Sequence, residues 1–128
     1  MTKLVTAAII IDSGKVFLTR RGPLEKLAGL WEFPGGKVEP GETLQQCLER
    51  ELKEELGLTC QVDEEILRSE YVYEHGSFNL VALKTTIRSG DITLSVHDKF
   101  DWVPIKDLLS YHLAPADVPI AKWIMGGN

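Results

Sequence analysis

A helical segment at residues 43–56 constrains the fold of this chain more than any other feature. Thr43 and Gln46 match a capping box at its start, and Gly57 occupies the position where a left-handed residue commonly ends a helix. No proline or glycine interrupts the segment, and leucines recur at every fourth position. The pattern predicts an amphipathic helix whose leucine stripe packs on a core.

Three carboxylates gather on one side of the same helix. On a helical wheel Glu51, Glu54 and Glu55 share an arc of ~100°, and Glu55 falls within the leucine stripe. Like charges so arranged destabilise a helix, and a carboxylate at the edge of a core costs more unless it is neutralised. A divalent cation would remove this cost, and Mg²⁺ or Mn²⁺ prefers oxygen ligands. The alternative interpretation is a solvated acidic face.

Strand signals dominate the rest of the chain. Runs at 4–11 and 15–20, separated by a turn at 12–14, predict a hairpin, and the Gly/Pro-rich stretch 22–41 predicts a long loop. Short helices are expected after Pro104 and Asp117. Further strands are predicted at 60–67, 70–73, 78–87 and 100–103. The order predicts an α+β fold in which helices pack on a mixed sheet.

Size and charge exclude several classes of protein. With 128 residues, 44% of them hydrophobic, we expect a single domain spanning residues 1–128. The formal charge of −5 argues against stable binding to nucleic acid, and no apolar run is long enough to cross a membrane, so we expect a cytoplasmic location. Cys47 and Cys60 lack the spacing of a zinc site and are expected to be reduced thiols. The oligomeric state stays open.

A longer motif surrounds the three carboxylates. Residues 36–58 read G-x5-E-x7-R-E-L-x-E-E-x-G-L without a mismatch. A phosphate-binding Walker A loop does not explain the glycines, because Trp31 stands where its first glycine is required and Val38 replaces its Ser/Thr. The motif resembles the signature of the Nudix hydrolases, and the chain is similar to the MutT-like nucleoside triphosphate pyrophosphohydrolases among them.

The resemblance implies a Nudix fold, an α/β/α sandwich with a mixed β-sheet. It implies that Glu51, Glu54 and Glu55, with the Gly35 carbonyl, bind Mg²⁺ or Mn²⁺ while water attacks a phosphorus atom of a nucleotide substrate. Arg50 is expected to support this site by pairing with a helix or loop carboxylate.

The general base is left open by the sequence. Asp98 and Asp101 precede Trp102, where MutT-like enzymes supply a further acidic residue, and Glu51 or Glu54 are alternatives. The three histidines, His75, His97 and His112, are interpreted as surface or loop residues.

Several residues are candidates for contact with the nucleotide. Lys37 and Arg21 are candidate phosphate ligands, and three aromatic residues could form a stacking wall. Asp117 could read N–H groups of cytosine or guanine, or it could simply cap the last helix. The aromatic candidates are Phe33, Tyr73 and Phe78.

The segment around Asp117, Leu-Ala-Pro-Ala-Asp-Val-Pro, resembles the CTP pyrophosphohydrolase branch. The expected substrates are therefore CTP, dCTP or modified nucleotides such as 8-oxo-dGTP, with a role in sanitising the nucleotide pool as part of DNA repair. Other nucleoside diphosphate derivatives, such as ADP-ribose or dinucleoside polyphosphates, are an alternative. A non-catalytic Nudix-fold binding module is a further one.

Overall fold

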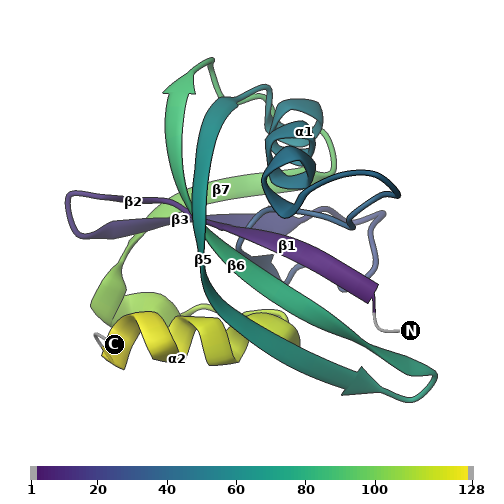
Figure 1. Cartoon of the computed structure of the whole chain (residues 1–128). Coiled ribbons are helices and arrows are strands. Elements are labelled where there is room, and N and C mark those ends of the chain that lie inside the picture. The colour runs from purple at the N-terminus through teal and green to yellow at the C-terminus, as the bar shows by residue number, and fades with distance from the viewer. Residues whose placement is uncertain (1–2, 127–128) are drawn as a thin grey trace.

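The computed structural model describes residues 3–126, in which two β-sheets lie between two helices (Figure 1). Helix α1 (Leu44–Leu56) covers one side and helix α2 (Val118–Gly126) the other. The strands are β1 (Lys3–Ile9), β2 (Ile11–Asp12), β3 (Lys15–Arg21), β4 (Trp31–Glu32), β5 (Thr59–Tyr73), β6 (Gly76–Ser89) and β7 (His97–Pro104), and two short 3₁₀ helices follow at Ile105–Ser110 and Pro115–Asp117. The expected α+β sandwich is confirmed. Within the described residues, no helix has the length and apolarity needed to cross a membrane.

The strands form two sheets. In the first, the order is β1-β6-β5, with β1 parallel to β6 and β5 antiparallel to it, so the sheet is mixed as expected. In the second, β3 pairs antiparallel with β2, β4 and β7. The segment 59–73 is one long strand with irregular pairing, where two strands were predicted.

The predicted hairpin at the start of the chain is mostly wrong. Of the chain before residue 13, only β2 pairs with β3, through a tight turn at Ser13 and Gly14 whose φ angles are both positive. Strand β1 instead runs parallel to β6, and its residues Ala7 and Ala8 are both fully buried. A strand that is apolar on both faces is typical of the interior of a parallel pair rather than of a hairpin with one face in solvent.

The helix predicted at residues 43–56 forms as expected. The Thr43 hydroxyl accepts a hydrogen bond from the Gln46 N–H at 3.0 Å, the Gln46 side chain accepts from the Thr43 N–H at 2.9 Å, and Gly57 ends the helix at φ 71°. Its leucines lie in a buried cluster with Phe17 of β3, whereas the next residue, Leu18, faces the cluster beneath α2. Strand β3 therefore divides the interior into an α1 side and an α2 side.

The chain from Trp31 to Val38 connects the two sheets. It begins as β4 on the edge of β3, and then follows the free edge of β1, where the Pro34 and Gly36 carbonyls accept from the Ala8 and Thr6 N–H groups, both at 2.7 Å. This connecting segment passes beside α1. It brings the glycines of the motif next to the helix carboxylates.

Candidate active site

The Glu51 carboxylate rests on the backbone of Gly36. A Cβ atom at Gly36 would lie 2.3 Å from the carboxyl carbon of Glu51 and 2.5–2.6 Å from its oxygens. Only glycine allows this approach. Glu51 is thereby fixed at the junction of α1 and the connecting segment, with its side chain 15% exposed.

Glu55 lies one turn along the helix in an acidic environment. Burial, together with the carboxylates of Glu51 and Glu32, raises the pKa of Glu55 to about 8. A destabilising free energy of this kind was predicted for a carboxylate at the edge of the leucine stripe. A cation at this position would relieve both the desolvation and the repulsion.

Arg50 is the hub of the ion pairs at this site. Its guanidinium donates to both oxygens of Glu42, at 2.7 and 3.0 Å, to Glu51 at 2.9 Å and to Glu54 at 3.0 Å. It also donates to the Lys37 carbonyl at 3.2 Å. Arg50 thus pairs with a loop carboxylate and with helix carboxylates, as expected, and its hydrogen bonds lower the pKa of Glu42 to about 2.

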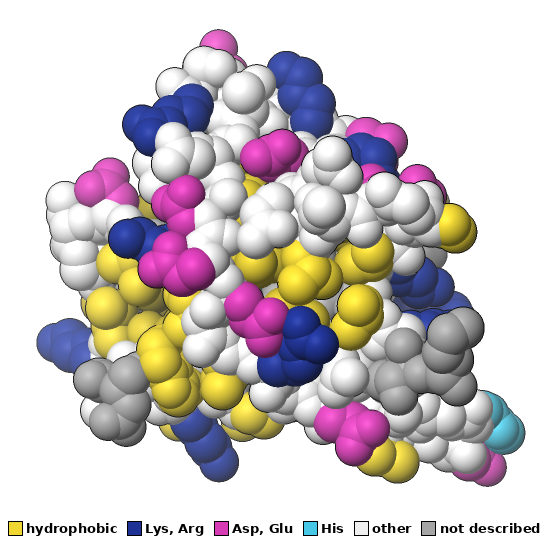
Figure 2. Space-filling view, in the orientation of Figure 1, with side chains coloured by type: hydrophobic (Ala, Val, Ile, Leu, Met, Phe, Trp, Pro, Cys, Tyr) yellow, Lys and Arg dark blue, Asp and Glu magenta, His cyan; other side chains and the backbone are white. Residues whose placement is uncertain are grey.

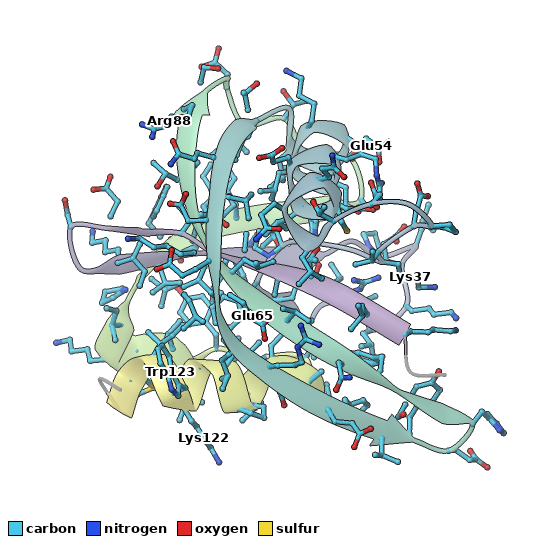
Figure 3. All side chains as sticks on the ribbon, viewed as in Figure 1. Lys37, Glu54, Glu65, Arg88, Lys122 and Trp123 are labelled. Carbon is cyan, nitrogen blue, oxygen red and sulfur yellow. The ribbon has the colours of Figure 1, made fainter. Side chains whose placement is uncertain are left out.

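Two of the three helix carboxylates, Glu51 and Glu54, meet at one nitrogen of the Arg50 guanidinium rather than at an open position for a metal ion. Glu54 is 60% exposed and is drawn to Arg50, and both it and Lys37 lie on the outer side of the molecule (Figure 3). Acidic and basic side chains are interspersed over this region, at the upper right of Figure 2. Among residues 3–126 no three acidic, histidine or cysteine side chains are grouped as a metal site. Lys37 is exposed, as a phosphate ligand or a plain surface charge would be.

The donor set at the junction nevertheless fits a hard divalent cation. Glu51 and Glu55 supply carboxylate oxygens, and the Gly35 carbonyl accepts no hydrogen bond from the described part of the chain. The carbonyls on either side of it, those of Pro34 and Gly36, are bonded to β1, so of these three carbonyls the Gly35 carbonyl is the one available as a ligand. Oxygen donors of this kind suit Mg²⁺ or Mn²⁺.

A second polar cluster, which the sequence analysis missed, adjoins the helix carboxylates. The Glu32 carboxylate accepts from the Arg21 guanidinium at 2.9 Å and lies 2.9 Å from Nε2 of His97. His97 is buried, so its interpretation as a surface residue is wrong, whereas His75 and His112 are exposed as expected. Arg21 also donates to the Lys26 carbonyl, so this candidate phosphate ligand has partners within the protein.

Asp117 is buried and does not cap α2. Its carboxylate accepts from the backbone N–H of Phe33 at 2.8 Å, across 84 residues of sequence, and it is 6% exposed. Burial, and then the nearby Glu32 carboxylate, raises the pKa of Asp117 well above its ordinary range. The cap interpretation is therefore wrong, and Glu32 acts electrostatically on both Asp117 and Glu55.

The two aspartates proposed as general base lie on the other side of the second sheet. Asp101 pairs with Leu18 on the α2 side and accepts from the Tyr111 hydroxyl. Asp98 forms a bidentate pair with Arg20, at 2.8 and 2.9 Å. Residues paired across strands share a face, which places Asp101 with Leu18. Asp98 lies at a register shift and follows Arg20, two residues from Leu18 on the same face, so neither carboxylate is brought to α1.

The three aromatic candidates differ in burial: Phe33 is buried, Phe78 is partly buried and Tyr73 is exposed. Phe33 is 3% exposed and packs within the α2-side cluster, so it offers a backbone N–H rather than a ring face. Tyr73 and Phe78 share one face of the β5–β6 hairpin, with ring centroids 6.2 Å apart, and Tyr71 lies 5.6 Å from Phe78. Tyr73 is 40% exposed and is the last residue of β5, at the tip of the hairpin.

A family model described as the NUDIX domain matches residues 1–124. The chain belongs to the Nudix family. It is 39% identical over 121 residues to the CTP pyrophosphohydrolase of Escherichia coli (strain K12), covering 94% of this chain and 90% of the relative. It is 32% identical over 122 residues to the 8-oxo-dGTP diphosphatase of the same organism, covering 94% and 95%.

Solved structures agree with this Nudix membership. The solution structure of the E. coli ORF135 protein superposes with a TM-score of 0.84 at 37% identity, covering 98% of this chain and 89% of that one. The crystal structure of the MutT protein from Methanosarcina mazei Go1 gives a TM-score of 0.82 at 25% identity, covering 99% and 95%. The chain is a Nudix nucleotide pyrophosphohydrolase of the branch that holds CTP pyrophosphohydrolase and 8-oxo-dGTP diphosphatase, and Nudix enzymes typically use a divalent metal ion.

Proposed function

We propose that this Nudix enzyme hydrolyses CTP and dCTP to the nucleoside monophosphate and pyrophosphate, with Mg²⁺ as its metal and Mn²⁺ as a substitute. The observation that carries the proposal is the buried Asp117 carboxyl, held by the Phe33 N–H. The 39% identity to a CTP pyrophosphohydrolase supports the same substrate class.

Asp117 suits cytosine because of its burial. The Watson–Crick edge of cytosine combines a donor, N4–H₂, with an acceptor, N3, whereas guanine presents two donors, N1–H and N2–H₂. A carboxylic acid that keeps its proton donates from one oxygen and accepts at the other, and so it matches cytosine. Burial favours this uncharged form of Asp117, and the Phe33 N–H reserves Oδ2 as the acceptor.

We assign Glu51, Glu55 and the Gly35 carbonyl as metal ligands. When bound, the ion would neutralise phosphate oxygens and lower the pKa of a water molecule. Arg50 orients Glu51 and Glu54 through its hydrogen bonds, and Gly36 allows the approach of Glu51. Glu54, exposed and held by Arg50, is the proposed acceptor of the proton from the attacking water, because Asp98 and Asp101 face the other side of the sheet.

A second candidate substrate is 8-oxo-dGTP. An ionised Asp117 would accept from both N–H groups of a guanine edge, and the 32% identity to an 8-oxo-dGTP diphosphatase supports this class. A role in nucleotide-pool sanitation and DNA repair would follow from activity on such damaged nucleotides.

A hydrolysis panel tests the proposal. Purified enzyme with Mg²⁺ is given CTP, dCTP, UTP, GTP, 8-oxo-dGTP, ADP-ribose and a dinucleoside polyphosphate in ¹⁸O-water, and the products are separated and weighed by mass spectrometry. We expect the cytosine nucleotides to have the highest kcat/KM, with monophosphate and pyrophosphate as products and no turnover after EDTA treatment. Orthophosphate as the first product, or turnover that survives EDTA, would overturn the assignment.

A further inference from the structure

His97 is buried against Glu32 and leaves one ring nitrogen without a partner. Its side chain is 1% exposed, Nε2 lies 2.9 Å from the Glu32 carboxylate, and Nδ1 is buried with no hydrogen-bond partner among residues 3–126. Glu32, which is also ion-paired with Arg21, acts as the acceptor, so Nε2 carries the hydrogen. Nδ1 is then an acceptor to which no group among residues 3–126 donates.

Three neighbouring strands build this arrangement. Arg21 on β3 is paired with His97 on β7, and Glu32 on β4 is paired with Thr19 on β3, so all three side chains point to the α1 side of the second sheet. Arg21 holds one oxygen of Glu32 and His97 holds the other. The carboxylate is therefore fixed in a single orientation by donors on both sides.

Fold stability alone does not explain the imidazole at this position. A buried polar atom without a partner destabilises a fold, so the unpartnered Nδ1 offsets part of the stabilisation that the contact with Glu32 contributes. The benefit of His97 has to come from what its other nitrogen does, namely the contact with Glu32.

Glu32 directly precedes Phe33, whose backbone N–H binds Asp117, and it lies close enough to both ends of the candidate site for its charge to act on each. Its charge acts on two groups. One is Glu55, an assigned metal ligand on α1, and the other is Asp117, which is proposed to bind the nucleotide base. A change in the orientation of Glu32 would alter the electrostatic environment of both groups.

We propose that His97 is a positioning residue for nucleotide hydrolysis, which holds Glu32 in the orientation that the site requires. The proposal rests on the proposed function, since it assumes that Asp117 and Glu55 serve substrate and metal. His97 is not a catalytic residue, because its side chain is enclosed by protein. It acts through Glu32 alone.

The test is a double-mutant cycle with a conservative rescue. His97→Leu removes the donor, His97→Gln keeps an amide N–H that can reach Glu32, and each is made in the wild type and in Glu32→Gln. His112→Gln, at an exposed histidine, is the matched control. Steady-state kinetics with CTP and Mg²⁺ and the melting temperature are measured for every variant.

We expect His97→Leu to lower kcat/KM about tenfold or more, the usual effect of losing a group that orients a functional carboxylate, while the variant stays folded at the assay temperature. His97→Gln should recover most of the activity, and His97→Leu should add little in the Glu32→Gln background. An equal loss in both backgrounds, no loss in the wild type, or a fall in melting temperature that accounts for the lost activity would overturn the proposal.

The ring tautomer separates this proposal from the function on which it rests. In ¹⁵N NMR of the ligand-free enzyme, His97 should be the Nε2–H tautomer, and its Nε2–H proton should shift in Glu32→Gln. If the wild type hydrolyses no nucleotide of the panel but this tautomer is present, the proposed function fails while the contact stands. An Nδ1–H tautomer would overturn the positioning role whatever the turnover.

Discussion

The carboxyl group of Asp117 accepts a hydrogen bond from the backbone N–H of Phe33 at 2.8 Å, although 84 residues separate them in sequence. The bond ties the 3₁₀ turn before α2 to the segment that connects the two sheets. It also fixes which oxygen of Asp117 must remain an acceptor, because a backbone N–H can only donate. The other oxygen is free to carry a proton.

This geometry makes Asp117→Asn an informative substitution. The Phe33 N–H should select the rotamer whose amide oxygen faces it, so that the NH₂ group replaces the protonated oxygen. We therefore expect the variant to keep kcat/KM for CTP within several-fold of the wild type. A loss of about 1–3 kcal/mol, the penalty for a mispaired base contact, would mean that the ionised carboxylate reads the base. Asp91→Asn, at an exposed loop carboxylate, is the control.

Substrate preference should depend on pH through the same residue. The Asp117 pKa is raised by burial and by Glu32, and the hydrogen bond from the Phe33 N–H and then the charge of Arg21 oppose this shift. As pH rises and the carboxyl loses its proton, kcat/KM for CTP should fall relative to that for 8-oxo-dGTP, whose guanine edge offers two donors. The ratio of the two values should fall with rising pH in the wild type and become independent of pH in Asp117→Asn. A ratio that is already independent of pH in the wild type would contradict this.

Two adjacent glycines should respond differently to alanine. A Cβ at Gly36 meets the carboxyl end of Glu51, a side chain that can move aside, whereas a Cβ at Gly35 would lie 1.9 Å from the backbone carbonyl oxygen of Thr6. Gly36→Ala should thus keep the fold and lower kcat/KM about 10–100-fold by displacing Glu51. Gly35→Ala should lower the melting temperature or prevent folding. Similar melting temperatures and similar activities for the two variants would disprove the distinction.

The parts of the structure that the sequence predicted are those built from short-range signals. The cap formed by Thr43 and Gln46, the end of the helix at Gly57 and the leucine stripe depend on residues a few positions apart. The pairing of Arg50 with a helix or loop carboxylate was predicted without naming the partner, and one of its partners, Glu54, lies four residues away on the helix. These features follow from helix geometry alone.

The parts that could not be predicted depend on pairing between distant segments. The first strand carries no signal that selects β6 over β3 as its partner, beyond its continuous apolar run. The contact between His97 and Glu32 spans 65 residues, and the sequence around each residue contains no motif that predicts it. Side chains alternate between the two faces of a strand, but this alternation places His97 and Glu32 on the same face only when the pairing of β3 with β4 and with β7 is known.

Glu55 predicts how the stability of the metal-free enzyme depends on pH. Its pKa is raised by burial, by Glu51 and by Glu32, from 4.5 to about 8, so the folded state holds a proton that the unfolded state releases. The stabilisation from this proton is complete below the unfolded pKa and is lost as pH rises through about 8. In EDTA, the melting temperature should therefore fall between about pH 5 and pH 9, and Mg²⁺ should raise it most at the alkaline end, where the carboxylate is ionised.

Glu55→Gln should flatten this pH profile of the melting temperature without abolishing it, because Asp117 contributes with the same sign. Glu54→Gln, at an exposed carboxylate on the same helix, should leave the profile between these pH values unchanged, and an equal effect of the two substitutions would exclude Glu55 as its source.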